Sequence, residues 1–134
     1  MNFNKTTEYS LRILSFMALD EKRLYSADYL FENIDIPFRY LRKLMTLLSK
    51  GDLIESVQGK GGGYRFSKNL DNISLLDIVQ SVGDDIPVER CFFGFENCAL
   101  RTPCAMHNKW IAIRENIRIV LKTTTLADFK TGGL

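Results

Sequence analysis

The residues best suited to chemistry are three cysteines and one histidine in the second half of the chain. They follow the pattern Cys91-x6-Cys98-x5-Cys104-x2-His107, and His107 is the only histidine of the protein. Thiolate and imidazole ligands suit zinc or an iron–sulfur cluster, and they disfavour magnesium, calcium and manganese. Because the four residues fall within seventeen positions, we predict that they share one metal site.

The spacing of these cysteines bears on which metal group they would hold. Structural zinc sites commonly use closely spaced pairs such as C-x2-C, because a short loop then wraps one small ion. This segment contains no such pair, and the wider spacing favours an iron–sulfur cluster. A histidine completing a cluster held by three thiolates would raise its reduction potential. The alternative is a zinc-stabilised winged-helix or interaction module, in which the same four side chains bind one tetrahedral ion.

Thiol catalysis is the third chemistry that these residues could support. A reactive cysteine needs a base beside it, and Cys104 with His107 is the only candidate pair. No acid or oxyanion-binding turn accompanies the pair in the sequence, so we do not expect an enzyme.

The composition is that of one folded domain. The chain has 134 residues, of which 46% are hydrophobic and 25% charged, values near the average for globular proteins. No apolar run approaches the ~18 residues of a membrane helix, and Glu8 and Arg12 fall where a signal peptide would be apolar. We therefore expect a cytoplasmic protein without a membrane partner, whose cysteines do not form structural disulfides.

Three apolar stretches in the first half of the chain have helical spacing. The first covers residues 6–19, with Thr6 as its cap, and the second follows Ser26 as its cap. The third begins at Pro37, a residue tolerated in a first helical turn, and stops at Gly51. Because a short turn separates the second stretch from the third, we predict a helix-turn-helix.

A β-hairpin is predicted directly after these helices. Extended segments at residues 53–57 and 64–67 flank the turn sequence QGKGGG. The predicted fold class is therefore mainly α with a small β-hairpin wing: a winged helix-turn-helix DNA-binding domain over residues 1–83, plus a long C-terminal dimerisation helix.

The remaining chain is predicted to contain a short helix, a loop and a longer helix. Ser74 and Asp77 resemble a capping box for the short helix, and residues 84–104 form the cysteine loop. Residues 105–134 hold the longer helix, over 105–121, and a tail in which Thr125 and Asp128 cap a last short turn.

An apolar stripe runs along the longer helix. Its residues recur at three- and four-residue steps: Met106, Trp110, Ile113, Ile117 and Val120. Such a stripe has to be buried, and we favour a second copy of the chain, in a two-fold homodimer, over packing onto the same domain.

The charge distribution indicates double-stranded DNA as a partner. Residues 37–65 contain six basic and two acidic side chains, whereas the whole chain has a net charge of only +2. The residues that we expect at the base edges lie early in the third helix: Arg39, Arg42 and Lys43. Tyr40 could contact sugar-phosphate, although we favour packing. On the wing, Lys60 and Arg65 would reach phosphate or the minor groove. A dimer would bind an inverted repeat.

Four segments in this order resemble one known family: YSLRIL, IPFRYLRKL, GKGGGYRFSK and CFFGFENCALRTPC. The chain resembles the IscR/NsrR family of bacterial transcription regulators, also called the Rrf-two type. The resemblance implies a homodimeric winged-helix repressor or activator whose long C-terminal helices cross at the dimer interface. It also implies an iron–sulfur cluster in the cysteine loop, whose occupancy or state alters DNA binding.

The resemblance also suggests which residues bind the cluster. It implies that Cys91, Cys98 and Cys104 are ligands. His107 matches the ligating histidine of the IscR branch, which favours a [2Fe–2S] cluster. Glu8 matches a position where NsrR-like members supply a carboxylate from the partner subunit, and [4Fe–4S] is the second alternative. The signal would be nitric oxide, redox state or iron–sulfur supply.

Overall fold

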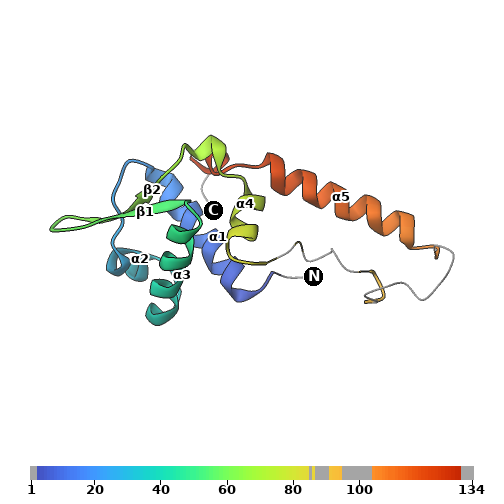
Figure 1. Ribbon diagram of the computed structural model, residues 1–134, viewed down its shortest axis with the longest axis horizontal. Coiled ribbons are helices and arrows are strands. Elements are labelled where there is room, and N and C mark those ends of the chain that lie inside the picture. Colours follow the sequence, from blue (N-terminus) through green and yellow to red (C-terminus); the bar gives the residue numbers. More distant parts are fainter. Residues whose placement is uncertain (1–2, 85, 87–90, 95–103, 131–134) are drawn as a thin grey trace.

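The computed structural model describes residues 3–84, 86, 91–94 and 104–130, and its order of elements is that of a winged helix followed by a long helix (Figure 1). The elements are α1 (Lys5–Met17), η1 (Ala18–Asp20), α2 (Ala27–Asn33), α3 (Phe38–Lys50), β1 (Ile54–Val57), β2 (Gly63–Phe66), η2 (Leu70–Asn72), α4 (Leu75–Ser81), α5 (His107–Thr123) and η3 (Leu126–Phe129). The predicted mainly α fold with a small β-hairpin wing is confirmed.

Local capping sets most helix starts. The Ser26 hydroxyl accepts a hydrogen bond from the Tyr29 backbone N–H at 3.1 Å, and Ser74 with Asp77 forms the predicted capping box. Thr125 and Asp128 form the second predicted box, at the start of η3. Each box satisfies backbone donors that the first turn leaves without a helical partner.

The predicted cap of α1 is wrong. Asn4 caps the helix, because its side-chain oxygen accepts a hydrogen bond from the Thr7 backbone N–H at 2.8 Å. Thr6 lies inside the first turn, and its hydroxyl bonds a distant side chain instead. Two other boundaries differ slightly: Pro37 is the N-cap of α3 rather than part of its first turn, and α5 begins at His107.

The main core lies between α1, α3 and the short elements that follow them. The inward face of α3 is fully buried, as its spacing predicted: Leu41, Leu44, Met45 and Leu48. Ile13, Leu14 and Met17 of α1 join the same cluster. A continuous apolar cluster of this kind is the main source of stability for the winged helix.

The wing is an antiparallel hairpin in which Ile54 pairs with Phe66 and Val57 with Gly63. Strand β1 begins one residue later than predicted, and β2 begins one residue earlier. The hairpin extends away from the helices (Figure 1). Strand β2 is joined to the segment before α2, because Tyr25 and Tyr64 form an isolated bridge.

Helix α5 projects beyond the winged helix, and its C-terminal end packs beside α4 (Figure 1). Trp110, Ile117 and Leu121 pack in a second, smaller cluster with Leu76 and Ile86. Two other residues of the predicted stripe stay open, with Ile113 42% and Val120 58% exposed, and Met106 is half-buried. The stripe is therefore divided between its own domain and solvent. No helix in the described ranges has the length and apolar character needed to span a membrane.

Candidate DNA-binding face and cysteine site

The exposed face of α3 carries three of the cations singled out in the sequence. Arg39, Arg42 and Lys43 are exposed, whereas Leu41 and Leu44 point into the core. This arrangement follows from the helical period, because residues three and four positions apart lie on the same side of a helix. Arg39 therefore shares a face with Arg42 and Lys43, and Leu41 shares the opposite face with Leu44 and Met45. In a helix-turn-helix this second helix enters the major groove, where arginine can form two hydrogen bonds to guanine.

Tyr40 differs from its basic neighbours because its side chain is half-buried. Its hydroxyl lies 2.6 Å from the Thr6 hydroxyl of α1, and its ring packs edge-on against Tyr9 with centroids 5.3 Å apart. The favoured interpretation of Tyr40 as a packing residue agrees with these contacts. Tyr40 links the predicted recognition helix to the first turn of α1.

The two cations of the wing have different surroundings. Arg65 Nε lies 2.7 Å from Glu55 Oε1 on the paired strand, with both side chains about half exposed. Lys60 lies in the turn between the strands and makes no ion pair with any residue in the described part of the chain. Lys60 is therefore available to a phosphate, whereas Arg65 would have to share its donors with Glu55.

The described part of the cysteine segment contacts the start of α5. Residues 91–94 form a turn closed by a 2.8 Å hydrogen bond from the Gly94 N–H to the Cys91 carbonyl. The Phe92 ring packs edge-on against Trp110, one turn into α5, with centroids 5.2 Å apart. This contact holds the Cys91 turn against the first turns of the helix.

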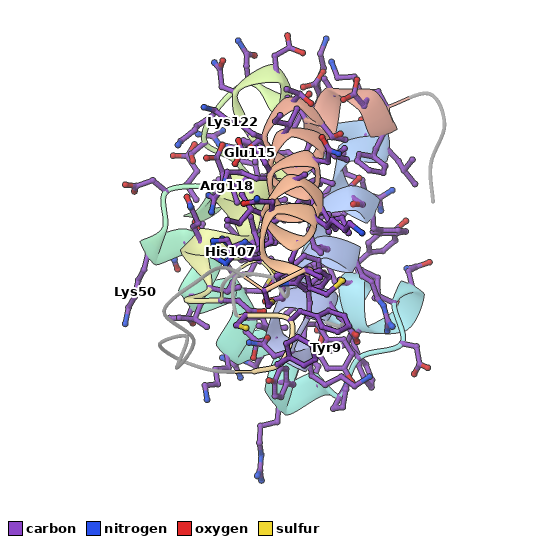
Figure 2. The ribbon with its side chains drawn as sticks, turned by 90° about the vertical axis from the view of Figure 1, so that its right-hand side faces the viewer. Tyr9, Lys50, His107, Glu115, Arg118 and Lys122 are labelled. Atoms are coloured by element: carbon purple, nitrogen blue, oxygen red, sulfur yellow. The ribbon has the colours of Figure 1, made fainter. Side chains whose placement is uncertain are left out.

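Cys104 and His107 occupy the same end of the molecule. The His107 N–H donates to the Cys104 carbonyl at 3.1 Å, and the exposed imidazole stands at the near end of α5 in Figure 2. Cys91 and Cys104 are free and partly buried. Cys98 lies outside the described residues.

These donors fit an iron–sulfur cluster or zinc by their chemistry, since thiols and an imidazole are the ligands that both use. Among the residues whose placement is described, no three histidine, cysteine or acidic side chains gather into a metal-binding group. Glu8 pairs with Lys5 at 3.2 Å in the first turn of α1. An acidic side chain in this first turn also interacts favourably with the helix dipole.

A hydrogen-bonded cluster that sequence reasoning missed joins the start of the cysteine segment to α1. Asp84 Oδ2 accepts from the Thr7 hydroxyl at 2.6 Å and from the Asn4 N–H at 3.3 Å. Thr7 is completely buried, and the neighbouring Thr6 bonds Tyr40. The first turn of α1 thus touches both Asp84 and α3. The only sequence signal was two polar residues at the start of an apolar helix.

A basic second helix beside a hairpin wing defines a winged-helix DNA-binding protein. The sequence model of the Rrf2 family, described as an iron-dependent transcriptional regulator, matches residues 3–131. The chain belongs to the Rrf2 family and is a DNA-binding transcriptional regulator rather than an enzyme.

Similar sequences carry the names of two regulators. NsrR of Shouchella clausii is 32% identical over 79% of this chain and 72% of its own length. NsrR of Halalkalibacterium halodurans is 30% identical over 98% of this chain and 91% of its own length. IscR of Yersinia pseudotuberculosis is 33% identical over 72% of this chain and 58% of its own length. The resemblance inferred from the sequence motifs is confirmed.

Solved structures show the same architecture. CymR, the global cysteine regulator of B. subtilis, superposes with a TM-score of 0.83 at 25% identity over 98% of this chain and 97% of that chain. Staphylococcus aureus CymR superposes with a TM-score of 0.76 at 26% identity, over 96% of this chain and 97% of that chain. T. potens IscR, at 22% identity over 96% and 85%, shares the fold with a TM-score of 0.72.

Proposed function

We propose that this regulator binds DNA as a homodimer and that an iron–sulfur cluster in its cysteine segment controls that binding. Residues 1–83 would bind DNA, residues 84–104 would hold the cluster, and residues 105–134 would dimerise. The observation that carries the proposal is the Phe92–Trp110 contact. It supports a shared site because the Cys91 turn meets the same end of α5 as Cys104 and His107.

In the proposed site Cys91, Cys98 and Cys104 bind the cluster, and either His107 or the partner's Glu8 completes it. The cluster would supply a group whose charge and occupancy change with nitric oxide, redox state or iron–sulfur supply. A [2Fe–2S] cluster is favoured if His107 is the fourth ligand, and [4Fe–4S] is the alternative. A structural zinc ion on the same residues is the competing proposal.

The route from the cysteine segment to DNA would pass through the first turn of α1. Asp84 precedes the segment and accepts hydrogen bonds from Asn4 and Thr7. Thr6 in the same turn bonds Tyr40 on α3. A change in the segment that moves Asp84 would therefore act on the orientation of α3, because the intervening contacts are short hydrogen bonds within a packed helix end.

In DNA, Arg39, Arg42 and Lys43 would contact base edges, and Lys60 and Arg65 would contact phosphate or the minor groove. Two copies related by a two-fold axis would bind an inverted repeat with half-sites about one or two helical turns apart. The exposed part of the α5 stripe supports this dimer, since Ile113 and Val120 are 42% and 58% exposed and belong to neither apolar cluster of the described residues.

Single cysteine variants test the cluster. Cys91→Ala, Cys98→Ala and Cys104→Ala should each abolish iron and sulfide binding in anaerobically purified protein. Gel filtration should still show a folded dimer, because Cys91 and Cys104 are absent from both core clusters. Full iron retention in any variant would remove that cysteine from the ligand set. Colourless protein with stoichiometric zinc would favour the structural zinc site.

The fourth ligand is tested by His107→Ala and Glu8→Ala, each with a matched control. Asn108→Ala alters the neighbouring exposed position, and Lys5→Ala breaks the Lys5–Glu8 pair while leaving the carboxylate. A spectral change with His107→Ala alone supports the histidine, and one with Glu8→Ala alone supports a ligand from the partner. If neither variant differs from its control, both ligand assignments are wrong.

A further inference from the structure

The segment between α1 and α2 holds an exposed arginine in a defined orientation. The Arg23 guanidinium carbon lies 3.9 Å from the centroid of the Tyr29 ring and 5.7 Å from that of Tyr25. Stacking of this kind covers a face of the guanidinium and leaves its in-plane N–H groups at the edge. Arg23 is exposed, so those donors point to solvent rather than into the core.

Tyr25, two residues after this arginine, is joined to strand β2 of the wing. Tyr25 and Tyr64 exchange two backbone hydrogen bonds, of 2.9 and 2.8 Å. The approach is close enough to require glycine at position 63, because a Cβ there would lie 2.8 Å from the Tyr25 carbonyl oxygen. Figure 1 shows the segment crossing the hairpin before it enters α2. Arg23 therefore lies at the junction of the wing and the helix-turn-helix.

The charges around Arg23 leave it available to an anion. Glu21, the nearest glutamate in the chain, pairs with Lys130 at 2.5 Å. Arg23 makes no ion pair with any residue in the described ranges. Burial and then the Asp20 carboxylate raise the pKa of Tyr25, the more distant of the two rings, whereas the charge of Arg23 lowers it.

We propose that Arg23 is a DNA-phosphate contact, held ready by Tyr29 between the phosphates reached by the wing and those reached by the helix-turn-helix. The planar fork of arginine donors matches phosphate oxygens, and fixing its plane lowers the entropy lost when the contact forms. The inference rests on the DNA-binding function and is independent of the iron–sulfur cluster.

Binding of a random-sequence DNA duplex to the full chain, followed by fluorescence anisotropy at several salt concentrations, tests the proposal. Arg23→Ala should weaken binding roughly fivefold to tenfold and lower the slope of log affinity against log salt by about 0.9 per protomer. Tyr29→Leu should weaken binding less and keep the slope, because the charge remains while its support is lost.

Two further variants separate the explanations. Lys122→Ala removes an exposed lysine near the C-terminal end of α5 (Figure 2) and should bind as the wild type does. Lys60→Ala reports on the wing in the same titrations. If Lys60→Ala lowers the slope and Arg23→Ala does not, the Arg23 proposal is wrong while DNA binding by the wing stands. If neither variant changes the slope, both are wrong.

Discussion

The winged-helix body (residues 5–81) and the C-terminal arm (residues 104–123) bury their apolar residues to very different degrees. In the body, Leu44 and Leu48 are at most 1% exposed. In the arm, Ile113 and Val120 are 42% and 58% exposed although they belong to one apolar stripe with Trp110. The body encloses its own core, whereas half of the arm's stripe needs an additional surface to cover it.

The two regions also differ in what they offer to ligands. The body exposes arginine and lysine on α3 and on the wing, where they can meet a polyanion without disturbing the core. The arm begins with Cys104 and His107, which are donors for soft metals. The first turn of α1 contacts both Asp84 and Tyr40, so it is the place where the regions can influence each other.

Because the body encloses a buried core, a core substitution there should lower the free energy of unfolding more than a substitution in the arm. Leu48→Ala should lower the free energy of unfolding by about 2–5 kcal/mol, because it leaves a cavity in a fully buried site. Val120→Ala in the arm should change it by less than about 0.5 kcal/mol in dilute, unpartnered protein. Urea denaturation measures both, and equal losses would contradict the difference between the regions.

A charge on the open part of the stripe should have the next largest effect. Ile113→Asp combined with Val120→Asp should weaken self-association on the order of 100-fold, because two carboxylates would be buried without partners. Ile119→Asp is the matched control: it is 49% exposed and lies about 100° around the helix from Val120. In analytical ultracentrifugation the double variant should sediment as a monomer, whereas the wild type and Ile119→Asp should sediment as dimers. A dimer that survives it would place the interface elsewhere.

Within the body, base-reading and phosphate-binding residues should behave differently. Arg42→Ala should cost about 1–3 kcal/mol on the specific operator and flatten the preference at one base pair per half-site. Lys60→Ala should weaken operator and scrambled duplex alike and reduce the salt slope by about one. Titrations on both duplexes measure these quantities. If both variants bind the operator as the wild type does, Arg42 and Lys60 face solvent and do not contact DNA.

The smallest expected effect concerns the link between the regions. Tyr40→Phe removes the hydroxyl that bonds Thr6 and should cost about 1 kcal/mol of stability. It should also narrow the difference in operator affinity between cluster-loaded and cluster-free protein. Tyr9→Phe, which keeps the ring contact with Tyr40, is the control. If Tyr40→Phe leaves the affinity difference between cluster-loaded and cluster-free protein unchanged, the Thr6–Tyr40 bond does not connect the cysteine segment to α3.

Much of the fold was predictable because it depends on neighbours in the chain. The hydroxyls of Ser26 and Ser74 cap helices through residues three positions away, and the inward face of α3 follows from its period. The cap of α1 was not predictable in the same way. Thr6 and Asn4 are both good caps by type, and the choice follows the bond that Thr6 makes to Tyr40, 34 positions away.

By itself, the sequence determined the winged helix, the basic outward face of α3 and the set of thiol and imidazole donors, because residue type, helical period and short-range capping carry that information. Only the tertiary structure decided that Arg65 pairs with Glu55, that Thr7 bonds Asp84 and that the α5 stripe is half covered. Those contacts join residues ten or more positions apart. Their partners depend on how whole elements pack, which no local pattern in the chain encodes.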